Sequence, residues 1–109
     1  MPRITRKKIL EKVAQLWPKA DATEITGMLD GCGRQARVQL AVLKLCEGDR
    51  EQLPRWVEAA KRDWRDVIAY AEYPKEMRTG PVELRAMSPE DKRALRERDR
   101  AQYLEWLGG

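Results

Sequence analysis

Histidine and phenylalanine are absent from the 109 residues, and cysteine occurs only twice. Without histidine, the chain lacks the commonest general base of enzymes and the side chain that titrates nearest to neutral pH. The two cysteines, Cys32 and Cys46, are too few for a disulfide framework, and no zinc-binding spacing or phosphate-binding glycine loop occurs. We therefore expect no metal, no cofactor and no enzymatic activity.

Long apolar runs are also missing, because no stretch approaches the roughly 18 residues that a membrane span requires. Charged residues make up 37% of the chain, and the mean hydropathy is −0.72, which is typical of a soluble protein. The first residues are basic and then alternate apolar with polar, unlike the unbroken apolar segment of a signal peptide. These features predict a cytoplasmic protein that has no membrane partner.

The strongest pattern present is a helical repeat of apolar residues. Between residues 53 and 71 they recur at intervals of three and four, which predicts one helix with a continuous apolar face. The members of this stripe are Leu53, Trp56, Val57, Ala60, Trp64, Val67, Ile68 and Ala71. We expect Trp56 and Trp64 to anchor the core, so that Trp64→Ala costs several kcal/mol. The helix begins either at Pro54 or after a short turn at residues 49–52.

Proline and glycine separate this helix from its neighbours. A first helix is predicted over residues 5–17, and Pro18 ends it because the residue before a proline disfavours the helical conformation. Asp21 and Glu24 have the spacing of a capping box, in which each side chain would bond a backbone N–H at the start of a second helix. Gly31 is expected to end that second helix.

The third predicted helix, over residues 34–47, is apolar around most of its circumference. Such a wide apolar band is typical of a helix at the centre of a bundle. Residues 75–87 show no clear repeat and are expected to form a loop. Ser88 followed by Pro89 is the sharpest helix start in the chain, because serine caps a helix and proline suits its first position. A last helix is therefore predicted over residues 88–107.

Together these elements predict an all-α fold in which residues 1–109 form one domain, a bundle of about five helices with the third and fourth central. We expect a non-enzymatic protein-interaction module that has a protein partner or self-associates. Its candidate contact surface lies at the end of the fourth helix and comprises Tyr73, Pro74, Met77 and Arg78. Alternatively, Tyr73 and Met77 merely cover the end of the bundle.

A nucleic-acid-binding protein is the alternative function. The first twelve residues carry a net charge of +4, equal to that of the whole chain. Residues 22–47 resemble a helix-turn-helix, with a glycine-containing turn between two helices. The fit is imperfect, because Gly31 falls one residue late and the following helix is too apolar to lie in a DNA groove. The candidate contacts are Arg3, Arg6, Lys7, Lys8, Lys12, Arg34 and Arg37.

Cys32 is the one candidate nucleophile. It lies between two glycines just before a predicted helix, with Arg34 nearby, and such a setting lowers the pKa of a thiol. The opposing interpretation is a small residue that fits a tight turn. No second catalytic group accompanies it.

Three stretches resemble a group of small bacterial helical proteins to which no function has been assigned. They read RVQLAVLKL at residues 37–45, AKRDWRDVIAYAEYP at 60–74 and QYLEWL at 102–107. The resemblance implies a small helical protein of bacterial origin, and it implies no activity, cofactor or site residue.

Overall fold

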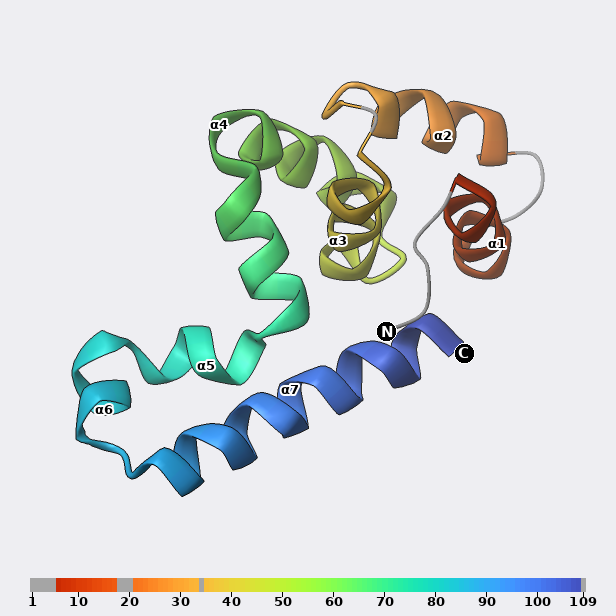
Figure 1. Cartoon of the computed structure of the whole chain (residues 1–109). Coiled ribbons are helices and arrows are strands. Elements are labelled where there is room, and N and C mark those ends of the chain that lie inside the picture. The colour runs from red at the N-terminus through yellow and green to blue at the C-terminus, as the bar shows by residue number, and fades with distance from the viewer. Residues whose placement is uncertain (1–5, 18–20, 34, 109) are drawn as a thin grey trace.

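The computed structural model describes residues 6–17, 21–33 and 35–108 (Figure 1). Every regular element in those ranges is helical, which confirms the predicted all-α class. The ranges hold seven α-helices rather than about five: α1 (Arg6–Leu16), α2 (Ala22–Asp30), α3 (Ala36–Cys46), α4 (Leu53–Glu72), α5 (Pro74–Thr79), α6 (Pro81–Ala86) and α7 (Pro89–Gly108). A short 3-10 helix, η2 (Arg50–Gln52), precedes α4. Pro18, the predicted end of the first helix, lies outside the described residues.

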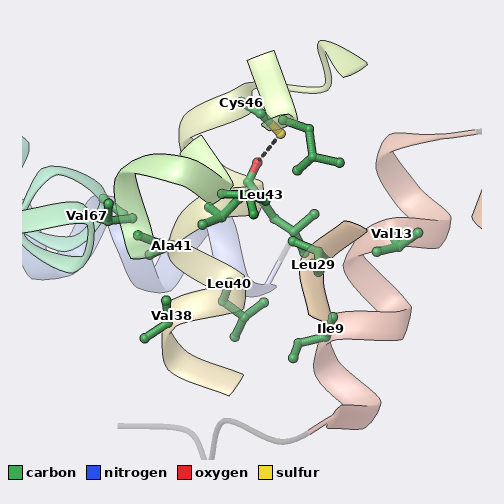
Figure 2. Close-up of a cluster of buried hydrophobic side chains, with 14 of the residues drawn as sticks. Ile9, Val13, Leu29, Val38, Leu40, Ala41, Leu43, Cys46 and Val67 are labelled. Carbon is green, nitrogen blue, oxygen red and sulfur yellow. Dashed lines mark hydrogen bonds between the residues drawn. The ribbon is translucent and has the colours of Figure 1, made fainter. Parts of the chain in front are cut away.

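The core is built around α3, as its apolar composition predicts. Seven of its eleven residues are buried, and its most extensive packing is with α4, so the predicted central pair is confirmed. Figure 2 shows Ile9 of α1 and Leu29 of α2 turned toward Leu40 and Leu43 of α3. All four side chains are within 1% of complete burial. Burial of that kind contributes roughly 1.5–3 kcal/mol for each large aliphatic side chain.

The predicted continuous stripe on α4 is wrong, because the helix bends at Asp63. Asp63 has an extended backbone (φ −153°, ψ 91°), and its Oδ1 accepts a hydrogen bond from the N–H of Arg65 at 3.1 Å. The aspartate therefore caps a second helical segment, residues 64–72, which leaves in a new direction (Figure 1). The bend removes Trp64 from the core and leaves it 44% exposed, so the prediction that Trp64 anchors the core is wrong. Trp56 is half-buried.

The predicted helix starts are confirmed only in part. Asp49 caps η2 by accepting the N–H of Glu51 at 2.9 Å, so α4 begins after a short turn rather than at Pro54. The capping box at Asp21 is wrong, since the Asp21 side chain makes no capping hydrogen bond. Both acids of that box instead form ion pairs with Arg50, which ties α2 to η2.

The predicted loop at residues 75–87 is also wrong, because it contains α5 and α6. Each of these six-residue helices has proline at its start, and Gly80 separates them with a φ of +83° that favours glycine. The start of α7 is as predicted, with Ser88 Oγ accepting the N–H of Asp91 at 3.1 Å. We call α5, α6 and residues 89–98 of α7 the arm, and it lies at the end of the molecule away from α1 and α2 (Figure 1).

Candidate functional site

The arm is attached to the rest of the molecule by a buried carboxylate. Asp99 of α7 is completely buried. Its Oδ1 accepts the backbone N–H of Lys75 and its Oδ2 accepts that of Glu76, both at 3.0 Å. The first N–H groups of a helix have no partner within the helix, so a carboxylate placed there satisfies them and opposes the positive end of the helix dipole. Asp99 thus caps α5 from a different helix.

A second polar contact joins α7 to the end of α4. The Nε2 of Gln102 donates to the carbonyl oxygen of Ala71 at 3.2 Å. The next residue of α4, Glu72, is buried, and its carboxylate accepts two hydrogen bonds from Arg37 of α3, from Nε and Nη2, both at 2.8 Å. The hydrogen bond with Glu72 raises the pKa of Arg37 and keeps its guanidinium charged. The junction of α3, α4, α5 and α7 is therefore held by directed hydrogen bonds.

The C-terminal end of α7 is fastened to α1. Lys12 is 3% exposed, and its Nζ donates to the carbonyl oxygen of Trp106 and lies 4.5 Å from the centre of the Trp106 ring. Burial, together with the charge of Lys8, lowers the pKa of Lys12. Tyr103 stacks on the same indole at 5.9 Å and is itself buried. The part of α7 that lies beyond the arm is thus fixed at both of its ends, at Asp99 and at Trp106.

A groove opens between α5, α6 and α7. Two adjoining hollows, of about 500 and about 530 Å³, share Glu76, Leu84 and Arg96 in their linings. The large half-buried apolar residues of the groove are Tyr73, Met77 and Leu84, and Ala69 of α4 lines it as well. No residue of α5 or α6 is buried, and none is buried in α7 before Asp99. The apolar side chains of the arm are therefore only partly covered.

The other side of the groove is basic. The cations that line it, including its continuation past Tyr73, are Arg85, Lys92, Arg93, Arg96 and Arg100. Lys92, Arg96 and Arg100 follow one another at intervals of four, which places them on one face of α7. The acids in the same linings are Glu76, which pairs with Arg96 at 3.4 Å, and Glu97. The groove is therefore electropositive.

The predicted contact surface is partly gathered here. Tyr73 and Met77 line the groove, Pro74 begins α5, and Arg78 is exposed in the last turn of that helix. Whether these residues bind a partner stays a prediction. The basic residues of α7 were missed, although their spacing of four was visible in the sequence. Leu84 is not identifiable from the sequence, because residues 75–87 show no clear repeat and are expected to form a loop.

Three of the five N-terminal cations predicted for nucleic acid make contacts within the chain. Arg6 pairs with Asp30 at 2.9 Å, Lys8 lies 3.7 Å from Glu11, and Lys12 is buried against Trp106. Lys7 is exposed on α1, and Arg3 lies outside the described residues.

The helix-turn-helix residues are likewise not presented as a reading surface. Arg37 is held by Glu72, and Arg34 lies outside the described residues. The second helix of the motif corresponds to α3, which is mostly buried and cannot enter a groove of DNA while it forms the core. Within the described chain, these observations give no support to a nucleic-acid surface on α2 and α3.

Cys32 does not have the environment of a reactive thiol. Its Sγ donates to the carbonyl oxygen of Leu29 at 3.0 Å, and burial raises its pKa. Of the two interpretations of Cys32, the lowered pKa is therefore contradicted, because partial burial disfavours the thiolate more than nearby cations favour it. A hollow of about 340 Å³ beside it is lined in part by Lys61 and Trp64.

Comparisons with known proteins return nothing: no protein-family model, no curated protein and no solved structure matches the chain. Among the described residues, no three side chains of His, Cys, Asp or Glu form a group that could hold a metal ion. None of the described helices combines the length and the apolar character needed to cross a bilayer.

Proposed function

We propose that this chain is a non-enzymatic protein-interaction module that binds its partner in the groove between α5, α6 and α7. One observation carries the proposal: the arm contains no buried residue, yet the buried Asp99 carboxylate holds it in place by accepting two backbone N–H groups of α5. A helical segment of a protein is normally stabilised by packing its apolar face against the rest of the fold. An arm that is positioned without burying its own apolar side chains leaves them for another molecule.

The chemistry of the groove supports the same proposal. Tyrosine, methionine and arginine are enriched at the centres of protein interfaces, and here they line one continuous hollow. The buried ionisable groups elsewhere support a binding role rather than catalysis. Asp99, Glu72 and Lys12 each bond to a backbone or side-chain group of another helix, so their polar atoms serve to join helices.

Site-specific photocrosslinking tests the proposal. A benzophenone side chain is introduced at Met77 in the groove and, as a matched control, at Glu58 on the exposed side of α4. In cells that make the full chain, we expect a discrete protein adduct from position 77 that is absent from position 58. Adding Leu84→Glu, which places a charge among the apolar groove residues, should abolish the adduct. Identical adducts from both positions, or none from position 77, would count against the proposal.

A further inference from the structure

We infer that the occupant of the groove is an acidic amphipathic helix of another protein, with apolar side chains against Tyr73, Met77 and Leu84 and carboxylates along α7. This inference rests on the proposed function and names the partner's chemistry. The apolar side of the groove requires apolar side chains on its occupant, and the basic side requires carboxylates. An amphipathic helix bound in a groove presents an apolar face and, beside it, a charged face, and both faces repeat with the same helical period.

The charge argument concerns the cations of the groove that form no ion pair. Among the described residues, Arg96 has an ion pair with Glu76, whereas Lys92, Arg93 and Arg100 take part in none of the ion pairs. The lining of the groove and its continuation holds five cations against two acids, so it carries an excess of positive charge. Carboxylates supplied by a partner complete these pairs and steer its approach.

The spacing of the cations matches a helix. Lys92 and Arg100 are eight residues apart on α7, about 12 Å along the helix axis at 1.5 Å per residue. Glutamates at every fourth position of a partner helix repeat with the same interval. The bound helix therefore runs along α7, with its apolar stripe over Met77 and Leu84, and covers the surface that the arm leaves open.

Two other occupants fit less well. A second copy bound symmetrically through this groove would bring like cations together, because both sides of such an interface are the same surface. A nucleic acid would find phosphate partners in Lys92, Arg93 and Arg100. However, it would leave the apolar residues of the groove unfilled.

The test uses the full chain and a fluorescein-labelled peptide of 18 residues as probe. The peptide has leucine on one helical face and glutamate on the rest. One comparison peptide has every glutamate replaced by glutamine, and the other has every leucine replaced by alanine. By fluorescence anisotropy we expect the acidic leucine peptide to bind at least about tenfold more tightly than either, since each loses one of the two kinds of contact. Equal binding of the glutamine peptide would overturn the inference.

Two variants of equal charge change locate the site. Arg93→Glu alters the groove, whereas Arg98→Glu alters an exposed position five residues on, roughly 140° around the same helix. We expect Arg93→Glu to weaken the acidic peptide about tenfold and Arg98→Glu to weaken it less than twofold. Equal effects of the two variants, or no binding of the acidic peptide to the parent, would overturn the inference.

Binding of a duplex DNA probe to the same two variants tests whether the groove binds nucleic acid instead. DNA binding that falls with Arg93→Glu, but not with Arg98→Glu, would assign the groove to nucleic acid and overturn the acidic-helix inference. Failure of this inference is distinguishable from failure of the proposed function. If the crosslink from position 77 persists while the acidic peptide does not bind, the interaction role stands and the partner's chemistry is wrong.

Discussion

Replacing Asp99 by asparagine tests how the arm is held. The carboxylate accepts one backbone N–H on each oxygen, from Lys75 and from Glu76. Asparagine has nearly the same shape, but it offers one oxygen and one NH₂ group. One of the two backbone N–H groups then faces another donor instead of an acceptor. The substitution changes the hydrogen bonding of the junction and leaves its packing almost unaltered.

The size of the effect follows from two opposed terms. Losing a hydrogen bond to a charged group and leaving a buried N–H without a partner costs about 1.5–3 kcal/mol. Asparagine also removes the cost of burying a charge, which offsets part of that loss. The capping loss dominates, because Asp99 also faces the positive end of the α5 dipole. We expect Asp99→Asn to lower the free energy of unfolding by about 2 kcal/mol, and Tm by about 8 °C.

Urea denaturation followed by circular dichroism measures this loss, and amide hydrogen exchange locates it. The amides of Lys75 and Glu76 should exchange faster in Asp99→Asn than in the parent chain. Glu97→Gln is the matched control, since it neutralises an exposed acid two residues away, and it should stay within about 0.5 kcal/mol of the parent. A variant at Asp99 that keeps the parent's stability and still protects both amides would refute the capping role.

Three further predictions concern single side chains. Trp64→Ala should lower the free energy of unfolding by less than about 1 kcal/mol in urea denaturation, because the indole is 44% exposed. Leu40→Ala, at a fully buried position, should lower it by about 2–5 kcal/mol. Equal losses for the two variants would contradict the bend at Asp63. Tyr103→Phe should be neutral or stabilising by up to about 1 kcal/mol, because the buried hydroxyl has no hydrogen-bond partner among the described residues. Burial also raises the pKa of Tyr103, so stability falls as pH rises past the ordinary tyrosine pKa of about 10, and the phenylalanine variant should lose less there in a pH series of thermal melts. Iodoacetamide at pH 7 should alkylate Cys32 more slowly in the native chain than in urea, and the reverse order would contradict its raised pKa.

The core could be predicted from sequence because its signals are local and repeated. The apolar circumference of α3 marks it as the central helix whatever its partners are. The Ser88-Pro89 pair and Asp49 mark helix starts through hydrogen bonds that span only two or three residues. Such features need no knowledge of the rest of the fold.

The bend in α4 could not be read from the same pattern. Asp63 lies among apolar residues spaced three and four apart, and this spacing is as regular across a break as within a helix. The capping side chain is only two residues from its N–H partner Arg65, but an aspartate on the polar side of a helix is common. Trp64 therefore counted as part of the stripe, although the new segment turns it toward solvent.

The sequence does not reveal the basic side of the groove or the buried polar junctions for a different reason, because charged residues are usually expected at the surface. Asp99 finds its partners more than twenty residues away, and Lys12 finds Trp106 almost a full chain length away. A single sequence does not show such pairings. Two six-residue helices are also too short to show a hydrophobic repeat, although Pro74 and Pro81 each stand at a position that suits a helix start.

The junction at Asp99 also explains why this chain uses buried polar contacts where apolar ones would be stronger. A buried ionic group seldom adds stability over well-packed apolar residues, but its hydrogen bonds are directional. Apolar packing would fix the arm only by covering Tyr73, Met77 and Leu84, the side chains that we propose contact a partner. The hydrogen bond that Asp99 accepts and the one that Gln102 donates fix the direction of α5 and α7 at one end and leave the groove open. A groove held in its binding geometry before the partner arrives loses less conformational entropy on binding, so its affinity is higher for the same contacts.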